Sequence, residues 1–277
     1  MLSFPLAATF LIWSTPQAAE PVLPPLAQAN LERNLRWMLE RERREAKLPE
    51  KERKPARVGV WADAGVWHPG ARSIVASLEA EGVPCRVLDR TSLTAEGLKG
   101  LESIVLPGGW APHQWQAAGT DGLAAIATYV DGGGHCLGIC AGAYLLSKTV
   151  RYDGVAYPYP LGLFDGTAEG PVPDLAKYPE PGSCRLTISK EGNERGFAAL
   201  EGVELYYSGG PSFEKGSGVT VLATYGKGAS AAISKKVGKG EIVLLGAHPE
   251  RPAKSNDDRD PPPKHAGPFF KSQTTTR

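Results

Sequence analysis

Cys140 stands where two stretches of different character meet in GGGHCLGICAGAYLLS, residues 132–147. The run before it is typical of a buried strand, and the small-residue run after it is typical of a helix. Residues 138–142, G-I-C-A-G, have the spacing of the G-x-S-x-G nucleophile elbow, with cysteine in place of serine. The start of a helix favours a thiolate, and the Ala141 N–H there is a candidate oxyanion donor. Alternatively, Cys140 is a small buried residue in a tight turn.

A second glycine-rich turn follows an apolar strand-like run in LPGGW, residues 106–110. Open α/β sheets bind their ligands outside the carboxyl ends of the strands, which is where this turn is expected to lie. The Gly109 N–H is therefore a candidate second oxyanion donor, and Trp110 is a candidate wall of the pocket. On its own, a Pro-Gly-Gly sequence is usually only a turn.

The third candidate is AHPE, residues 247–250, at the end of the last apolar run. Pro249 favours an extended conformation at His248, and in an extended chain residues two apart point the same way. Glu250 is then placed to fix the imidazole tautomer of His248, while the other ring nitrogen faces the nucleophile. Taken alone, His-Pro-Glu is more often a strand exit.

Further residues are weaker candidates for lining the pocket. Tyr144 follows the elbow, while His68 and the pair Tyr206–Tyr207 lie in stretches that end predicted strands. Trp115 either flanks the pocket or packs inside the domain. A structural role is the alternative for each of these side chains.

The sequence predicts neither a metal nor a cofactor. His113 and His135 have no metal-ligand spacing with any cysteine. A phosphate-binding glycine loop followed by Lys-Ser or Lys-Thr is absent from the sequence, which argues against a nucleoside triphosphate site. The formal net charge of +1 gives no electrostatic reason to expect nucleic acid or an anionic membrane as a partner.

Strand-like and helix-like runs alternate from about residue 56 to residue 146. Expected strands are 56–63, 83–89, 101–109 and 135–139, and expected helices are 70–82 and 120–131, with Gly132 beyond the end of the second. This alternation predicts an α/β fold with a largely parallel sheet and helices on both faces. Residues 151–175, rich in Tyr, Pro and Gly, are expected to form a long irregular loop, and five further strands follow in hairpin-like succession.

Both ends of the chain differ from this domain, which we place at residues 55–250. Residues 1–29 resemble a signal or targeting segment, with an apolar stretch from Leu2 to Trp13 and candidate cleavage sites after Ala19 and Ala29. Residues 30–54 form a charged helical linker, with Leu31, Leu35, Met38 and Leu39 at helical spacing. Residues 251–277 are expected to be a disordered tail.

The targeting segment predicts an exported protein, periplasmic or extracellular, with membrane anchoring only through that segment. Export would place the four cysteines in an oxidising space where disulfides form. A nucleophilic Cys140 must stay free, so at most one bridge is expected among Cys85, Cys136 and Cys184. The sequence does not say which pair would form it.

The elbow, the Pro-Gly-Gly turn and the His-Pro-Glu sequence, in this order, resemble the class I glutamine amidotransferase-like superfamily. The resemblance is sharper to the branch found at the N-terminus of eukaryotic biotin–protein ligases and in standalone bacterial proteins. It is carried by IVLPGG, YVDGGGHCLGICAGAYLLS, FDGTAEGP, ELYYSGGPSF and KVGKGEIVLLGAHPE and covers about residues 56–250. It implies a flavodoxin-like doubly wound, largely parallel sheet with a C-terminal antiparallel strand extension. It also implies Cys140 as nucleophile, His248 as base and Glu250 as orienting acid.

The sequence departs from that superfamily in several respects. Glutaminase domains typically follow the elbow with Gly-His-Gln, whereas here Gly142, Ala143 and Tyr144 follow it. Free glutamine is therefore a doubtful substrate. A G-R-G-R-x-G stretch, the mark of a biotinylating domain, is absent from the sequence, so biotin ligase activity is not expected. Relatives usually carry a helix after His-x-Glu, where a disordered tail is expected here.

Two functions from different classes follow. The first is an exported cysteine-dependent amidohydrolase or acyl-transfer enzyme acting on a small-molecule or peptide-like amide. The second is a non-catalytic binding or regulatory module that retains the geometry of the elbow.

Overall fold

The structure, a computed structural model, describes residues 24–52, 54–214, 216–255 and 258–274. The predicted targeting segment lies almost entirely outside these residues. The helices are α1 (Pro25–Ala46), α2 (His68–Ala80), α3 (Ala95–Leu98), α4 (Ala111–Asp131), α5 (Ala141–Leu146), α6 (Lys190–Glu194) and α7 (Ala266–Gln273), with short 3-10 turns at Glu50–Glu52, Arg90–Ser92 and Phe197–Leu200. The strands are β1 (Val58–Trp61), β2 (Cys85–Leu88), β3 (Ser103–Leu106), β4 (His135–Ile139), β5 (Ser147–Tyr152), β6 (Val155–Pro158), β7 (Phe164–Gly170), β8 (Gly182–Cys184), β9 (Thr187–Ile188), β10 (Leu205–Tyr207), β11 (Ser212–Glu214), β12 (Val219–Thr224), β13 (Ser230–Val237), β14 (Gly240–Leu245) and β15 (His248–Pro252).

The main sheet has a parallel half and an extended mixed half. Its strand order is β2-β1-β3-β4-β14-β13-β11-β7-β5-β6, with β12 and β9 branching from β13. Strands β2, β1, β3, β4 and β14 are parallel to one another, and β13 continues the sheet antiparallel to β14. The expected α/β class, with a parallel sheet and an antiparallel extension, is confirmed.

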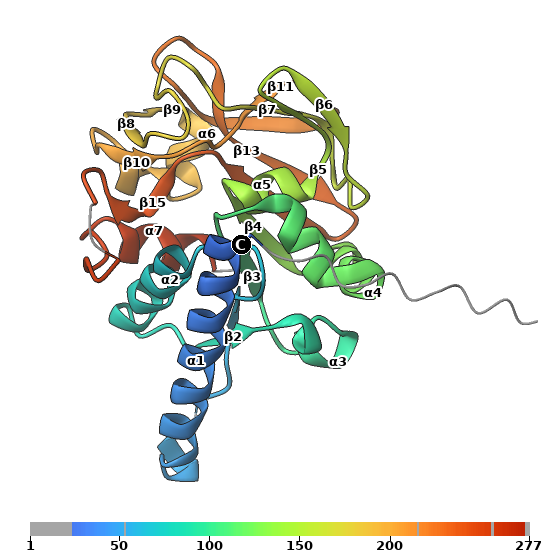
Figure 1. Cartoon of the computed structure of the whole chain (residues 1–277), viewed down its shortest axis with the longest axis vertical. Helices are drawn as coiled ribbons and strands as arrows, with labels where there is room; N and C mark the ends of the chain where they lie inside the picture. The colour runs from blue at the N-terminus through green and yellow to red at the C-terminus, as the bar shows by residue number, and fades with distance from the viewer. Residues whose placement is uncertain (1–23, 53, 215, 256–257, 275–277) are drawn as a thin grey trace, which may run out of the picture.

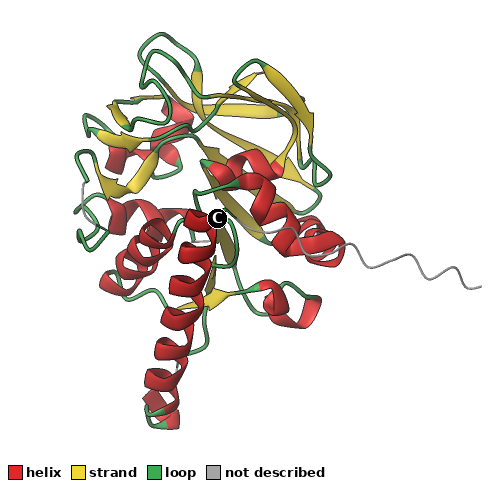
Figure 2. Ribbon diagram, in the orientation of Figure 1, coloured by secondary structure: helices red, strands yellow, loops and turns green. Residues whose placement is uncertain are grey.

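Alternating side chains divide the core into two layers, one on each face of the parallel strands. On one face, Ile104 and Leu106 pack with α4 and α5, and on the other Val105 packs with α2 and α7. Figures 1 and 2 show these helix groups on opposite sides of the sheet. Both faces are therefore buried, as a doubly wound sheet requires.

Two expectations about elements inside the domain are wrong. Residues 151–175 are not a long irregular loop, because β5, β6 and β7 occupy most of 147–170. The helix expected from Thr120 begins earlier, at Ala111, and is kinked at Gly119, where φ is 63°. A glycine adopts this left-handed conformation without steric cost, so the two helical segments join there.

The tail is also not disordered over residues 258–274. Helix α7 packs against α2 with Phe269 and Phe270 fully buried, and Phe197 meets Phe269 edge-to-face at 5.2 Å. Burying these rings removes a large apolar area from water, which outweighs the polar composition of the preceding segment. The tail thus supplies the helix that the resemblance implies after His-x-Glu.

The N-terminal helix α1 starts at Pro25 and is more than a linker (Figure 1). Its buried side is mainly polar, because Asn30, Asn34 and Arg41 lie on it together with Met38, while Leu35 and Leu39 are exposed. Asn34 Nδ2 donates to the Val66 carbonyl at 3.2 Å. The apolar spacing in the sequence therefore marked the buried face only in part, through Met38 and through Leu31, which packs against the core.

No helix of the described ranges has both the length and the apolar character needed to cross a membrane.

Candidate active site

Cys140 lies in a sharp turn between β4 and α5 with φ 49° and ψ −106°. Positive φ is rare for a residue with a side chain and costs energy that its surroundings must offset. The Cys140 N–H donates to the Leu245 carbonyl at 2.9 Å, and the Cys140 carbonyl accepts from the Ala143 and Tyr144 N–H groups at 3.0 Å each. These bonds hold the residue in its strained conformation.

The two glycines that flank the turn are required by close backbone approach. A Cβ on Gly142 would overlap the Leu106 carbonyl, and a Cβ on Gly138 would lie 2.8 Å from the carbonyl oxygen of Gly142. The turn therefore packs directly on the end of β3, which brings Cys140 next to the Pro-Gly-Gly turn.

Gly108 occupies the gap between Cys140 and His248. A Cβ on Gly108 would overlap His248 Cε1 and lie 3.4 Å from Cys140 Cβ. The missing side chain is thus what allows the imidazole to approach the cysteine.

Gly109 and Ala141 present N–H groups beside Cys140. Gly109, at φ 138°, forms an antiparallel bridge with Val66 in which the flanking residues make the hydrogen bonds: Trp67 N–H to the Gly108 carbonyl at 2.9 Å, and Trp110 N–H to the Gly65 carbonyl at 2.7 Å. In such a bridge the Gly109 N–H points away from its partner strand. Neither this N–H nor that of Ala141 donates to a backbone carbonyl of the described chain.

His248 and Glu250 form a buried pair at the start of β15. This strand is not a continuation of β14, which ends at Leu245. It belongs to a separate three-stranded sheet. His248 Nδ1 lies 2.7 Å from Glu250 Oε1, and their side chains are 3% and 0% exposed. Glu250 also packs beside Gly70, in the first turn of α2, where the helix dipole stabilises negative charge.

The protonated form of His248 is strongly stabilised. Burial alone would lower the pKa of this imidazole, but the negative charges of Glu250 and Cys140 and hydrogen bonds with both side chains raise it to about 10. The surroundings of His248 therefore favour the protonated ring.

Two aromatic side chains pack around the histidine, and an arginine packs on one of them. Trp67 and Tyr206 each meet the His248 ring nearly edge-on, at centroid distances of 5.8 and 5.7 Å, and they stack on each other at 5.8 Å. The Arg251 guanidinium lies over Trp67 at 5.4 Å. These contacts fix the plane of the imidazole. Trp67 and Arg251 were not predicted from the sequence.

A cavity of about 360 Å³ opens beside Cys140. Gly109, Ala141 and Ser208 line it next to the cysteine, and the Cys140 thiol donates to the Ser208 carbonyl, with 3.6 Å between Sγ and O. Its remaining wall is mainly aromatic: Trp110, Tyr144, Tyr152, Tyr157, Tyr159 and Tyr178. The structure thus brings four predicted residues, Gly109, Trp110, Ala141 and Tyr144, together with Cys140.

Four of the candidate lining residues are not on the wall of this cavity: His68, Trp115, Tyr206 and Tyr207. Trp115 packs behind the wall against Tyr159 at 5.3 Å, and Tyr206 packs against His248. Tyr207 is fully buried, where its hydroxyl donates to the Gly210 carbonyl at 2.7 Å and accepts from the Val172 N–H at 2.7 Å. It is a structural residue, because both hydrogen-bonding functions of its hydroxyl are used inside the protein.

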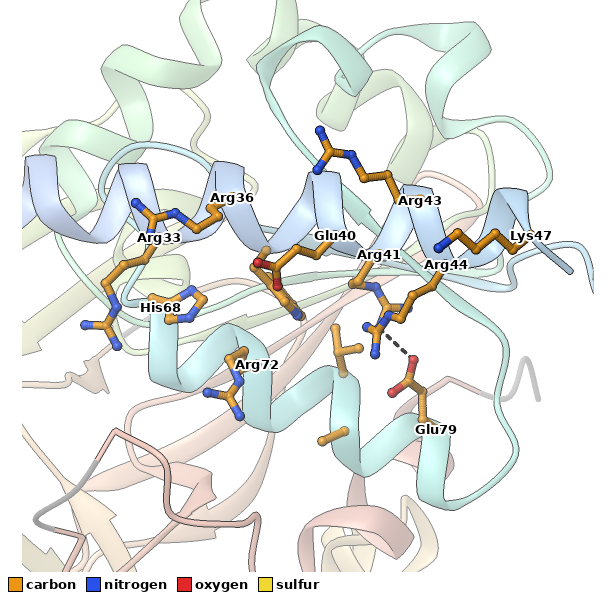
Figure 3. A pocket seen from close by; sticks show the side chains of 13 residues that line it. Arg33, Arg36, Glu40, Arg41, Arg43, Arg44, Lys47, His68, Arg72 and Glu79 are labelled. Atoms are coloured by element: carbon orange, nitrogen blue, oxygen red, sulfur yellow. Dashed lines mark hydrogen bonds and ion pairs between the residues drawn. The ribbon is translucent and has the colours of Figure 1, made fainter.

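His68 lies in a different place, at the start of α2 and against α1 (Figure 3). Its Nδ1 is 2.8 Å from Asn34 Oδ1, and its backbone N–H donates to Asn30 Oδ1 at 2.9 Å. It lines a separate groove of about 690 Å³ between the two helices. Figure 3 shows the arginines of that groove projecting in several directions, with no common point of convergence.

Four tyrosines of the cavity were missed by the sequence interpretation: Tyr152, Tyr157, Tyr159 and Tyr178. Tyr152 is on β5, Tyr157 is on β6 and Tyr159 follows β6, all within the stretch expected to be irregular. Tyr178 comes from the loop before β8. The dense YDGVAYPYP sequence, residues 152–160, was the available signal.

The described residues include all four cysteines, and all four are free and buried. Burial raises the pKa of the Cys85 and Cys184 thiols to about 12 and that of Cys136 further. In the described ranges, no cluster of three or more His, Cys, Asp or Glu side chains is arranged to hold a metal ion.

Comparisons with known proteins agree on the fold. The family model described as "Biotin-protein ligase, N terminal" matches residues 85–272. A biotin–protein ligase of Schizosaccharomyces pombe is 33% identical over 174 residues, covering 57% of this chain and 27% of the ligase. The chain therefore spans about a quarter of that relative's length.

Two further matches cover most of this chain and most of the protein to which it is aligned. An uncharacterised protein of Chlamydia muridarum is 33% identical over 213 residues, or 70% of this chain and 80% of that protein. A crystal structure of a glutamine amidotransferase superposes with a TM-score of 0.56 at 21% identity, over 79% of this chain and 99% of that one. This second likeness shows the fold alone.

Proposed function

The chain belongs to the biotin-protein ligase N-terminal family and has a glutamine amidotransferase-like fold, and we propose that it is a cysteine-dependent amidohydrolase or acyl-transfer enzyme. The observation that carries this proposal is the alignment of Cys140, Gly108, His248 and Glu250. A strained cysteine faces a histidine across a glycine gap, and a buried carboxylate bonds the far nitrogen of that histidine.

In the proposed reaction, Cys140 Sγ attacks the carbonyl carbon of an amide while His248 receives the thiol proton. The C–N bond then breaks, and His248 returns that proton to the departing amine, which leaves a thioester on Cys140. Water next attacks the thioester carbon and gives one proton to His248. The C–S bond breaks, the acid leaves and the thiol is restored. In acyl transfer, an amine takes the place of water.

Gly109 and Ala141 supply the proposed oxyanion donors. Their N–H groups flank the cavity at Cys140 and have no backbone acceptor in the described chain. Backbone donors already fixed where charge develops stabilise the tetrahedral intermediate without reorganisation.

Glu250 is the proposed orienting group. Its bond to Nδ1 leaves Nε2 to face the cysteine, and its charge stabilises the imidazolium that forms in the first step. The raised pKa of His248, about 10, supports this assignment, because it shows how strongly the surroundings favour the protonated ring.

Biotin ligation does not form part of the proposal. The sequence similarity covers only 27% of the Schizosaccharomyces pombe ligase, and the sequence has no G-R-G-R-x-G stretch. Shared ancestry with that protein supports a common fold for the matched region, while the chemistry proposed here rests on the elbow and the histidine–glutamate pair.

A second candidate is a binding or regulatory module without turnover. The observation that favours it is the Cys140 thiol bonded to the Ser208 carbonyl at 3.6 Å, with only 6% of the residue exposed. A thiol held as a donor to a carbonyl is not poised as a nucleophile.

Alkylation separates the two candidates. Cys140 and Cys184 are both 6% exposed, so the exposed fraction of the residue does not by itself favour either one. We expect iodoacetamide at neutral pH to modify Cys140 well before Cys184, Cys85 or Cys136, with peptide mass spectrometry as the readout. Cys140→Ala should remove both this label and any acyl-enzyme, and Cys184→Ala should retain them. Equal, slow labelling of all four cysteines would rule out the enzyme.

We also propose that the protein is exported, periplasmic or extracellular. The support is the apolar stretch from Leu2 to Trp13 followed by small residues. Residues 1–29 fused to a reporter should direct it out of the cytoplasm, and the matched fusion of residues 30–54 should not. Retention of the first fusion in the cytosol would overturn this proposal.

A further inference from the structure

The cavity beside Cys140 has an aromatic wall drawn from separate parts of the chain. Trp110 stands before α4, Tyr144 is in α5, and Tyr152 and Tyr157 are on β5 and β6. Tyr178 closes the wall from the loop before β8. Such a surface is built from several elements, so it is not the buried stripe of a single helix or strand.

Apart from Cys140, the described residues that line the cavity carry no formal charge at neutral pH. None of the residues that border the cavity is Asp, Glu, Lys, Arg or His. Burial raises the pKa of Tyr159 to about 12 and the pKa values of Tyr144 and Tyr152 further, so these phenols stay neutral at every ordinary pH. A charged ligand group would lose its hydration there without gaining an ion pair.

Neighbouring rings of this wall meet edge-to-face. Tyr144 meets Tyr152 at 5.8 Å and 71°, and Tyr152 meets Tyr178 at 5.8 Å and 86°. Tyr157 and Tyr178 are 47% and 46% exposed, so both rings keep surface that a ligand can cover at the mouth of the cavity. Aromatic pairs gain most from edge-to-face or offset contacts, which a further ring can make with these faces.

We propose that this cavity binds the acyl part of an uncharged amide that ends in an aromatic ring. This inference rests on the proposed function, because it names the class of substrate whose carbonyl Cys140 would attack. The volume of about 360 Å³ accommodates a ring with a short linker and lies at the lower end of small-molecule pockets. Free glutamine fits poorly, since neither its ammonium nor its carboxylate finds a charged partner in the lining.

Binding can be measured without any turnover on the full-length Cys140→Ala protein. The probes are phenylacetamide, acetamide and L-glutamine, and the readout is saturation-transfer NMR titration. We expect phenylacetamide to bind about tenfold or more tightly than either other probe, because burial of one ring contributes that much. Equal affinity for the three probes would overturn the inference.

Variants at the mouth of the cavity locate the site. Tyr157→Ala and Tyr178→Ala, each combined with Cys140→Ala, change exposed side chains and so should fold. Each should weaken phenylacetamide binding about fivefold, as expected for loss of one ring contact. Val155→Ala is the matched control, because Val155 is 52% exposed on the same strand as Tyr157 but does not line the cavity. Unchanged binding in both tyrosine variants would contradict the proposal.

The parent protein distinguishes this inference from the proposed function. Incubation with phenylacetic acid p-nitroanilide should give a phenylacetyl adduct on Cys140, and acetyl p-nitroanilide should give less. Selective binding of phenylacetamide without any adduct would support the ring site and overturn the enzyme. An adduct formed equally from both anilides would support the enzyme and overturn the ring site.

Discussion

Two buried histidines of this protein share nearly the same packing and differ in charge. His248 and His68 are 2% and 6% exposed, and each meets a tryptophan edge-on, Trp67 at 5.8 Å and Trp37 at 5.7 Å. Each also places Nδ1 near a side-chain oxygen, at 2.7 Å for His248 and 2.8 Å for His68. Burial and ring contacts therefore cannot account for any difference in their protonation.

The difference lies in the charge of the groups around each ring. Burial lowers the pKa of both, but the carboxylate of Glu250 and the charge of Cys140 raise that of His248 to about 10. His68 has the neutral amide of Asn34 as its partner, and the positive charges of Arg33 and Arg72 add to the effect of burial, so its pKa falls to about 4. Partner charge thus makes one histidine a proton acceptor and the other a neutral link between two helices.

The largest expected effect comes from removing each ring in turn. His248→Asn should slow Cys140 alkylation and any turnover by about 10²–10⁴-fold, the usual contribution of a general base. His68→Asn should leave both rates close to those of the parent. Rates measured by mass spectrometry under identical conditions test this pair, and equal losses in the two variants would remove the distinction between the histidines.

The second largest effect comes from displacing His248 without changing the charged groups around it. Gly108→Ala keeps Glu250 and Cys140 but puts a methyl group against His248 Cε1. We expect a loss of about 10²-fold in turnover, because a displacement near 1 Å costs that much. Gly226→Ala is the matched control, since a Cβ there meets nothing within 4 Å. Thermal melting should show both variants folded, and a fully active Gly108→Ala would mean that the glycine gap has no role.

The third effect comes from changing the charge of each histidine's side-chain partner, which should make the pKa values of His248 and His68 more alike. Glu250→Gln should lower the pKa of His248, shift Cys140 alkylation to higher pH and reduce turnover about tenfold, less than Cys140→Ala, because the oxyanion donors remain. Asn34→Asp should raise the pKa of His68 from about 4. NMR titration of the two rings measures both shifts. If Glu250→Gln labels and turns over like the parent, the site reduces to a Cys–His pair.

The smallest effect is on the free energy of unfolding, whose dependence on pH has opposite signs for His68 and His248. The folded pKa of His68, about 4, lies below its ordinary 6.5, so the unfolded chain binds more protons in that window. Stability is then lost as the pH falls from 6.5 to about 4, by up to about 3 kcal/mol. His248 contributes stability that is full below pH 6.5 and is lost as the pH rises through about 10.

Denaturant unfolding across the pH range tests both the loss of stability at acid pH (the acid limb) and the loss at alkaline pH (the alkaline limb). His68→Asn should flatten the acid limb, and His248→Asn should flatten the alkaline limb. His113→Asn, a change on the surface of α4, serves as the control for both. An acid limb unchanged by His68→Asn would show that other groups govern acid unfolding.

The sequence was most informative where a local pattern requires a particular backbone. The elbow at Cys140 and the turn at Gly109 are such patterns, because small residues there permit positive φ or close approach. The spacing of His248 and Glu250 likewise follows from extended chain. The alternation of strands and helices up to residue 146 was predicted for the same reason, since periodicity reports local burial.

The parts that were missed depend on distant contacts. All four residues of β6 are exposed, so this strand gives no alternating apolar signal and is held by pairing with β5. Helix α7 has only a short apolar sequence, and Phe269 and Phe270 gain their burial from α2. Neither contact can be read from the residues nearby.

Helix α1 was misread because a buried polar face has no signature in an apolar pattern. Asn30 and Asn34 are buried because they satisfy backbone groups of the segment that leads into α2. That segment bridges Gly109 through Val66. The helix thereby supports the turn beside Cys140, a role that the spacing of leucines could not reveal.

If the proposed targeting segment is cleaved, this arrangement distinguishes the two candidate cleavage sites. Cleavage after Ala19 would leave α1 whole, because the helix begins at Pro25. Cleavage after Ala29 would remove residues 25–29, including the buried Ala27, and would place a charged ammonium on Asn30, whose side chain accepts from the His68 N–H. A processing enzyme acting there would trim away part of the support of the active site. Of the two candidate cleavage sites, only the one after Ala19 is compatible with an intact α1.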